Sequence, residues 1–326
     1  MSRMQGKVLP ERSADPQVYV GIDVCKDWLD VYLHPLGEAF RVANDRQGLN
    51  LLKRRLDGQR VARIVLEATG KYHRQAHRNL HAAGFAVAVL NPLRGRLFAQ
   101  ASGALAKTDR IDARLLAVAA ESLAPAARPP APEVREALQE LIHARSAGVA
   151  EATALANRRR ASQTAYLRTE FDRRIKSLAS HIARLEAEIQ RRIEADPGLQ
   201  RRYAILSSIP SIGKVAAWAL LVDLAELGSC SAKAAALLAG LAPIANDSGQ
   251  QRGERHIRGG RANVRAALYM AAVTAIRVNP DAAAFYNRLR AAGKAAKVAL
   301  TAVMRKLVVL ANTLITEDRL WEPLRP

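Results

Sequence analysis

The stretch 18-VYVGIDVCKDWLDVYLHPLGEAFRVA-43 decides the fold of the first third of the chain. Its apolar and β-branched residues predict three short strands, over 18–24, 28–34 and 39–42, which are joined by tight polar turns. Strands that are connected so closely pair antiparallel. The chain is therefore expected to open with a three-stranded antiparallel sheet.

Helices and strands alternate after this sheet. The hydrophobic pattern predicts helices at 46–56, 72–83 and 109–120 and strands at 62–66 and 85–90. Three antiparallel strands followed by parallel strands and crossing helices are typical of a ribonuclease-H-like α/β domain. We expect this domain over 18–124, after a tail at 1–17, with its first and fourth strands as neighbours.

The middle of the chain is predicted to be a long helical region. Prolines between 125 and 132 mark a linker, and a helical pattern then runs over 133–196. Inside it, apolar residues recur at spacings of three and four: Ile175, Leu178, Ile182, Leu185 and Ile189. Such a seam indicates a coiled coil, which would pair subunits, and a plain helical hairpin is the alternative.

The charge of the chain indicates a phosphate-rich partner. The 326 residues include 50 Lys and Arg against 30 Asp and Glu, a net charge of +20, and 39 of the basic residues are arginine. Residues 251–310 hold 12 basic and 2 acidic residues, which is half of the excess. Guanidinium groups match phosphate oxygens well. An arginine-rich genome is the alternative explanation, but it does not account for so uneven a distribution.

Several classes of protein are disfavoured by composition. Two cysteines cannot build a disulfide framework or a four-ligand zinc site. The N-terminus lacks a signal-peptide pattern, and no apolar run is expected to span a bilayer. We therefore expect a cytoplasmic protein that binds nucleic acid and has no membrane contact.

Four carboxylates stand out by their positions. Asp23 ends the first predicted strand and Glu67 ends the fourth, while Asp109 and Asp112 lie three residues apart on one helix face. In the expected sheet the two strand ends converge, and the helix would deliver the aspartate pair. Four carboxylates in one place need neutralisation, and their oxygens suit Mg²⁺ or Mn²⁺. An acidic residue at a strand end is, by itself, more often a turn or cap residue.

The C-terminal part, over 199–316, is predicted to be mostly helical, with one polar loop over 243–260. Near its start, the stretch 209-IPSIGK-214 resembles a helix-hairpin-helix turn, which aims backbone N–H groups at a DNA phosphate. Ser211 stands where that motif usually has glycine. An ordinary joint between two helices is the alternative, and Lys214 is a candidate phosphate contact in either case.

The polar loop contains a second candidate for chemistry. Ser248 precedes Gly249 and is followed by five arginines, which are Arg252, Arg255, Arg258, Arg261 and Arg265. A serine in this position is ordinarily a turn residue. The arginines make a nucleophile the alternative, because they stabilise the charge that develops during attack on a phosphate.

Several motifs, taken in order, resemble the IS110 family of insertion-sequence transposases. They are 21-GID-23, 66-LEATG-70, 91-NP-92, 107-KTDRIDAR-114, 209-IPSIG-213, 239-AGLAP-243, 247-DSG-249 and 265-RAALYM-270. The similarity runs from about residue 18 to about residue 315. Together these motifs are more specific than any one of them.

The resemblance implies a RuvC-type domain whose Asp-Glu-Asp-Asp tetrad is Asp23, Glu67, Asp109 and Asp112. It also implies a C-terminal transposase domain with Ser248 as the nucleophile. Members of this family resemble recombinases guided by a structured non-coding RNA that pairs with donor and target DNA. They assemble as homo-oligomers, dimers or tetramers, in which the tetrad of one subunit meets the serine of another. Lys107, beside the tetrad, is a further candidate nucleic-acid contact.

A DNA recombinase of a mobile element is the reading that these observations favour. Two alternatives remain open. A metal-dependent nuclease of the Holliday-junction type would use water as the nucleophile and leave free DNA ends. A non-catalytic nucleic-acid scaffold would keep the fold without cutting, although the complete tetrad argues against it.

Overall fold

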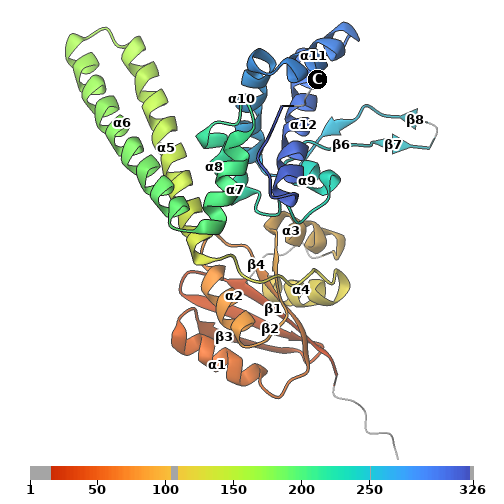
Figure 1. The fold of residues 1–326 in the computed structure, drawn as a ribbon. Coiled ribbons are helices and arrows are strands. Elements are labelled where there is room, and N and C mark those ends of the chain that lie inside the picture. Colours follow the sequence, from red (N-terminus) through yellow and green to blue (C-terminus); the bar gives the residue numbers. More distant parts are fainter. Residues whose placement is uncertain (1–15, 104–108, 250, 324–326) are drawn as a thin grey trace, which may run out of the picture. The chain divides into compact units, whose positions relative to one another are not determined.

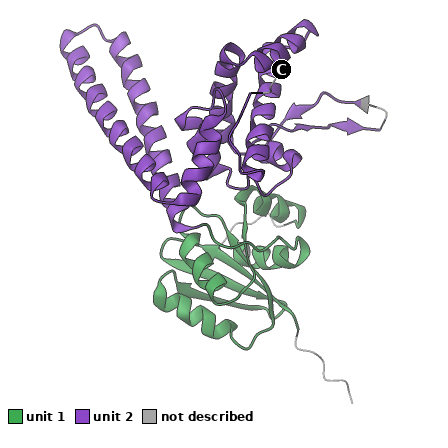
Figure 2. Cartoon of the chain, in the orientation of Figure 1, with its two compact units in different colours: residues 1–131 green, residues 132–326 purple. Residues whose placement is uncertain are grey.

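The protein divides into two compact units, residues 1–131 and 132–326 (Figure 2). The structure, a computed structural model, describes residues 16–103, 109–249 and 251–323, with the backbone alone for 109–111 and 251. Lys107 and most of the predicted tail at 1–17 therefore lie outside the described residues. The boundary between the units falls in the proline-rich linker.

The first unit is built on a five-stranded mixed sheet with the order β3-β2-β1-β4-β5 (Figure 1). Strands β1, β2 and β3 pair antiparallel, whereas β1, β4 and β5 pair parallel. The predicted adjacency of the first and fourth strands is thus confirmed. The strands are β1 Val18–Val24, β2 Trp28–His34, β3 Glu38–Ala43, β4 Val61–Glu67 and β5 Val87–Leu90.

Helices cover both faces of this sheet. Residues of α1 (Arg46–Leu56) and α2 (His73–Ala82) join one core cluster, which includes Val20 and Ile22 of β1. Residues of α4 (Asp109–Ser122) join the cluster on the opposite face. Alternation along β1 therefore directs Ile22 towards α1 and α2, and its neighbours Gly21 and Asp23 towards α4.

One helix of the first unit is absent from our prediction. Helix α3 (Pro92–Ala101) follows β5 directly, with Asn91 as its N-cap and Pro92 in its first turn. The sequence predicts a strand over 85–90 that is closed by Asn91 and Pro92, since proline commonly ends a strand. Proline is also favoured at the first position of a helix, because the missing N–H would have no partner there.

The second unit is mostly helical and begins with a long antiparallel hairpin of α5 (Glu133–Ala161) and α6 (Ala165–Glu194). The predicted continuous helix is interrupted at 162–164. The seam on α6 packs within the hairpin, since a Cβ added to Gly148 of α5 would lie 3.2 Å from Ile182. Within the chain, α5 and α6 form the hairpin that was the alternative, and pairing of the seam between subunits stays a prediction.

The remaining helices of the second unit surround one hydrophobic core. They are α7 (Pro197–Ser208), α8 (Lys214–Asp223), α9 (Ala232–Leu238), α10 (Ala262–Val278), α11 (Pro280–Ala291) and α12 (Ala296–Thr316). The expectation that no apolar segment is long enough for a bilayer was wrong for α12, whose mean hydropathy reaches 1.7. Its burial explains that composition, because Leu300, Val303 and Leu307 all lie in the core.

The predicted polar loop over 243–260 contains short strands. Strand β6 (Pro243–Ile244) pairs with β9 (His256–Ile257), and β7 (Asp247–Ser248) pairs with β8 (Gln251–Arg252), both antiparallel. Figure 1 shows β6, β7 and β8 extending away from the helices of the second unit. We call residues 243–257 the serine arm.

Candidate functional site

Two of the predicted carboxylates end neighbouring parallel strands. The register between β1 and β4 last pairs Ile22 with Leu66, so Asp23 and Glu67 are the next residues on the two strands. Ile22 and Leu66 are fully buried, while Asp23 and Glu67 are half-buried. The sheet therefore brings both carboxylates to the same edge and leaves them accessible.

The third carboxylate lies on the helix that crosses this edge. Helix α4 contacts β1 so closely that a Cβ added to Gly21 would lie 2.1 Å from the carbonyl oxygen of Ala113. Asp112 precedes Ala113 and is half-buried. Asp23 is two residues beyond Gly21 on the same face of β1. Glycine at position 21 thus permits the close approach that brings Asp112 near the strand ends.

The donors at this edge suit a hard divalent cation, since Asp23, Glu67 and Asp112 offer only carboxylate oxygens. Among the described side chains, no group of three or more His, Cys, Asp or Glu is gathered tightly enough to hold a metal ion. Asp109 is the fourth member of the predicted tetrad, and its side chain lies outside that description. The residues fit a metal by the chemistry of their donors, and the sheet brings two of them, Asp23 and Glu67, to one edge.

Ser248 lies near the end of the serine arm. Its backbone pairs with Gln251, and the next residue, Gly249, has a φ of +56°. That left-handed conformation favours glycine and allows the chain to turn back. Ser248 is exposed. The hydroxyl is therefore presented on a narrow hairpin rather than in a pocket.

The base of the serine arm is held by contacts between backbones. A Cβ added to Gly260 would lie 2.1 Å from the backbone nitrogen of Gly240, so only glycine allows the two ends of the loop to meet. Next to this contact, Arg265 donates from Nη1 to the carbonyl oxygen of Gly259 at 2.8 Å. We call this contact of Gly240 with Gly259 and Gly260 the neck of the serine arm; it holds the two ends of the loop together.

The five arginines after Ser248 fall into different settings. Arg252 and Arg258 are exposed, and Arg255 forms an ion pair with Asp247, with 3.7 Å between Nη2 and Oδ2. Arg265 donates its hydrogen bond to the carbonyl oxygen of Gly259. Arg261 donates two hydrogen bonds of 2.6 Å to the carboxylate of Glu226, which raises the pKa of Arg261 and lowers that of Glu226. The arginines predicted as one phosphate-binding set therefore have different surroundings: Arg252 and Arg255 lie on the arm, Arg258 follows it, and Arg261 and Arg265 make contacts at its base.

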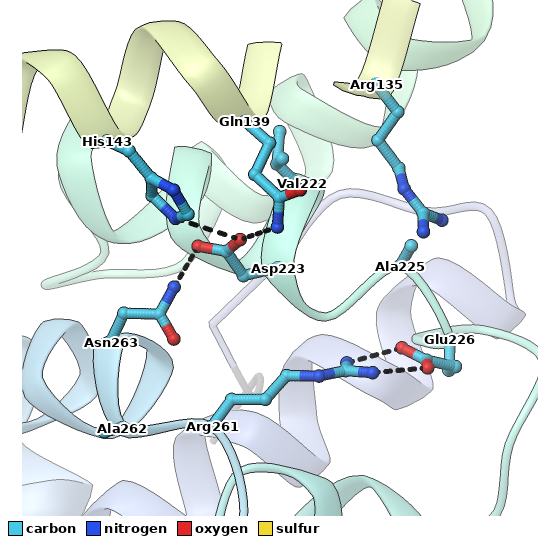
Figure 3. Close-up of a pocket in the computed structure, with 10 residues that line it drawn as sticks. All are labelled: Arg135, Gln139, His143, Val222, Asp223, Ala225, Glu226, Arg261, Ala262 and Asn263. Atoms are coloured by element: carbon cyan, nitrogen blue, oxygen red, sulfur yellow. Dashed lines mark hydrogen bonds and ion pairs between the residues drawn. The ribbon is translucent and has the colours of Figure 1, made fainter. Parts of the chain in front are cut away.

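A pocket of about 530 Å³ lies beside this ion pair (Figure 3). At its wall, the buried carboxylate of Asp223 accepts hydrogen bonds from Gln139 at 3.0 Å and from Asn263, with His143 at 3.9 Å. Asp223 ends α8, and Asn263 lies in the first turn of α10. Together with the Glu226–Arg261 pair, this network fixes the start of α10, directly after the neck of the serine arm.

Our sequence reading missed Asp223 and Glu226. A usable signal was present, because these two acids interrupt the apolar run 219-ALLVDLAELG-228. A charged residue in a buried helix needs a partner. Their partners lie 35 or more residues away along the chain and could not be named from spacing.

The helix-hairpin-helix-like turn joins α7 to α8 over 209–213. Ser211 has a φ of +83°, so a serine adopts the conformation for which the motif usually has glycine. Gly213 caps α8 without a side-chain hydrogen bond. Lys214, which we predicted as a phosphate contact, forms an ion pair with Glu186 of α6.

Comparison with known proteins matches most of the chain to one group of transposases. A family model described as "Transposase IS116/IS110/IS902 family" matches residues 203–287, and a transposase model of DEDD type for IS110 matches residues 20–166. The chain is 28% identical over 317 residues to the pilin gene-inverting protein of Moraxella bovis, covering 93% of this chain and 97% of that protein.

Two further relatives agree with these matches. The pilin gene-inverting protein of Moraxella lacunata is also 28% identical, over the same shares of both chains. An "Insertion element IS110 uncharacterized 43.6 kDa protein" of Streptomyces coelicolor is 31% identical over 145 residues, which is 44% of this chain and 35% of that protein.

Proposed function

The chain belongs to the IS110 family and is a DNA transposase, and from that premise we propose that it exchanges DNA strands through a covalent link to Ser248. In this proposal, residues 18–124 are a RuvC-type, ribonuclease-H-like catalytic domain. The helical region over 133–196 connects it to a C-terminal transposase domain over 199–316. The observation that carries the metal-dependent part of the proposal is the adjacency of Asp23 and Glu67 at the ends of paired parallel strands, and the exposed position of Ser248 beside Gly249 supports its role as the nucleophile.

Asp23, Glu67, Asp109 and Asp112 form the metal-binding tetrad of the proposed enzyme. The DEDD-type match indicates use of a divalent metal, and the oxygen donors favour Mg²⁺ or Mn²⁺. When bound, such an ion polarises the scissile phosphate and stabilises the negative charge of the transition state. The role of the strand ends is to hold two carboxylates at a fixed separation, and that of α4 is to add the aspartate pair.

Ser248 provides the nucleophile. Its Oγ attacks the phosphorus and loses its proton, a phosphoserine ester forms, and the bond to the 3′ oxygen breaks to leave a 3′-hydroxyl. A 3′-hydroxyl of the partner strand then attacks the ester, which rejoins DNA and restores the serine. The phosphate bond energy is kept in the ester, so no nucleotide cofactor is needed. In this proposal the exposed side chains of Arg252 and Arg258 contact phosphates near the reacting group.

The proposed partners are donor and target DNA, a structured non-coding guide RNA and further copies of this chain. The exposed serine arm supports the last of these, since a lone hydroxyl on a hairpin needs activation from elsewhere. A dimer or tetramer in which the arm meets another subunit's tetrad meets that need. The name of the Moraxella relatives, gene-inverting protein, supports recombination as the reaction class. We place the enzyme in the bacterial cytoplasm, on the nucleoid.

Strand exchange with Ser248→Ala tests this function. The full chain, a divalent metal, the flanking non-coding RNA and donor and target DNA would be combined, and products separated by size. We expect joined products from the wild type and neither joined nor cut DNA from Ser248→Ala, while DNA binding is kept. Cut ends from both proteins would favour a metal-dependent nuclease. No product from either protein would favour a scaffold.

A further inference from the structure

The α5–α6 hairpin concentrates positive charge at its tip. Residues 157–176 contain seven Lys and Arg against two Asp and Glu, a net charge of +5. The rest of the hairpin, 133–156 and 177–194, contains five basic and seven acidic residues, a net charge of −2. With about 1.5 Å of rise per residue, each helix is about 43 Å long, so the tip is well separated from the core of the second unit.

Only part of the charge at the tip is neutralised locally. Within the hairpin, Arg159 pairs with Asp172, Arg173 with Glu170 and Arg174 with Glu151. Arg168 donates to the carbonyl oxygen of Ser162 and closes the turn. Three exposed cations at the tip form no ion pair with any residue that the structure describes: Arg158, Arg160 and Lys176.

An aromatic side chain is exposed at the same end of the hairpin as these cations. Tyr166 lies in the first turn of α6 and is 70% exposed, and its neighbour Leu167 is 44% exposed. Neither residue joins the hydrophobic core of the second unit. A flat ring that is held on a helix, at the end of the hairpin that carries the unpaired cations, can stack on another flat group.

Helix stability accounts for only some of these features. Basic residues in the last turn of α5 interact favourably with the helix dipole, which explains a charge or two at Arg158, Arg159 and Arg160. It does not explain an exposed tyrosine. Duplex DNA would satisfy the cations but keeps its bases stacked on one another. Unpaired nucleotides offer both phosphates and a free π-face, and a stacked aromatic ring is the usual way to hold them.

We propose that the tip of the α5–α6 hairpin is a second nucleic-acid-binding surface, which holds unpaired nucleotides. Tyr166 stacks on a base, and Arg158 and Arg160 contact the flanking phosphates. The surface uses residues apart from the strand-end carboxylates and from the serine arm. It rests on the proposed function only in that the protein binds nucleic acid, and it does not depend on Ser248 as the nucleophile.

Binding of short labelled oligonucleotides to the full chain tests the surface. One sequence would be offered as single-stranded RNA, single-stranded DNA and duplex DNA, with fluorescence anisotropy as the readout. We expect Tyr166→Ala to weaken single-strand binding by about 5- to 100-fold and to leave duplex binding unchanged. Tyr166→Phe keeps the ring and should bind like the wild type. The single-stranded probe with the larger loss identifies RNA or DNA as the ligand.

A matched pair of charge reversals separates a local surface from general electrostatics. Arg160→Glu at the tip should weaken single-strand binding more than Arg184→Glu, which reverses the same charge on α6 outside the tip. Equal losses from the two variants would overturn the proposal, as would wild-type binding by Tyr166→Ala. Light scattering that shows Tyr166→Ala dissociating the oligomer, with nucleic-acid binding intact, would also overturn it and assign the tip to a protein contact. Because strand exchange is not measured, the result is independent of the test on Ser248.

Discussion

The carboxylate edge of the first unit and the serine arm of the second are held in opposite ways. Asp23 and Glu67 follow Ile22 and Leu66, which are fully buried, so a hydrophobic core on both sides of the sheet fixes their backbone. The serine arm consists of paired two-residue strands, and its Ile244 is 42% exposed. The comparison teaches that the proposed metal-binding groups are positioned by packing, whereas the proposed nucleophile is positioned by short strand pairs and by the contacts at the base of the arm.

The contrast has a chemical reason in the proposed mechanism. Carboxylates that share a cation must keep fixed separations, because errors of a fraction of an ångström lose coordination. A nucleophile that reaches another subunit's tetrad and a DNA strand needs projection more than burial. We therefore expect substitutions to act globally at the carboxylate edge and locally at the arm.

The largest effect is expected where α4 crosses β1. Gly21→Val inserts side-chain atoms where even a Cβ would lie 2.1 Å from a backbone oxygen of Ala113, so α4 must move away from the sheet. Such overpacking against backbone costs about 3 kcal/mol or more. Hydrogen exchange should show loss of protection in β1 and α4 together, and strand exchange should be abolished.

Gly95→Ala in α3 is the matched control. The added Cβ would meet the side chain of Leu90 at 3.8 Å, which is an ordinary contact, and alanine favours a helix. Protection should be unchanged or slightly higher. If Gly21→Val kept the hydrogen-exchange protection and the strand-exchange activity of the wild type, the close approach of α4 would not be what holds Asp23 and Glu67 in place.

A smaller and more local effect is expected at the Glu226–Arg261 ion pair, which lies next to the neck of the serine arm. Glu226→Gln removes the charge that binds Arg261 and leaves that guanidinium half-buried with a weaker partner. Hydrogen bonds between charged groups contribute about 1.5–3 kcal/mol, and solvent at this partly exposed pair reduces that value. Hydrogen exchange should rise over 256–264 but not in β1. A uniform change across both units would contradict a local role.

The Glu226–Arg261 pair also predicts that the local stability of residues 256–264 depends on pH. Hydrogen bonding to Arg261 lowers the pKa of Glu226 in the folded protein. A carboxyl whose pKa is lowered on folding contributes stability that is present above its unfolded pKa, about 4.3, and is lost as pH falls through the folded value. Protection of 256–264 in the wild type should therefore decline below about pH 4. Glu226→Gln should show a weaker decline over that range.

The smallest effect is expected from single arginines that follow the serine arm. Each phosphate contact that is lost should reduce the slope of log affinity against log salt by about 0.9 for duplex DNA. Arg258→Gln should flatten the slope, because Arg258 is exposed. Arg261→Gln should change it less, because Arg261 is bound to Glu226. Titrations of duplex DNA with both variants at several salt concentrations would measure the two slopes. A larger change of slope for Arg261→Gln than for Arg258→Gln would indicate that Arg261 contacts the DNA.

The sheet could be predicted from the sequence because its signals are local. Alternating β-branched residues over 18–43 and tight turns indicate three antiparallel strands, and the apolar run at 62–66 indicates a buried strand. Helix α3 was missed because Pro92 serves equally as a strand end and as a helix start. The strands of the serine arm are two residues long, too short for any periodicity.

The candidate site was predictable in its residues but not in its supports. Strand-end carboxylates and a serine before glycine are visible as patterns. The neck between Gly240 and Gly260, and the pair of Glu226 with Arg261, join residues 20 and 35 positions apart. No spacing rule links such residues, because tertiary packing alone brings them together.

The central claim is that Ser248 carries the DNA during exchange, and identifying the linked residue tests it most directly. A reaction of the full chain with donor and target DNA would be stopped by denaturation, digested with nuclease and protease, and measured by mass spectrometry. We predict a peptide that bears a phosphonucleotide on Ser248, absent from Ser248→Ala and from Asp23→Asn. Cut DNA with no linked peptide, or a nucleotide on another residue, would contradict the account.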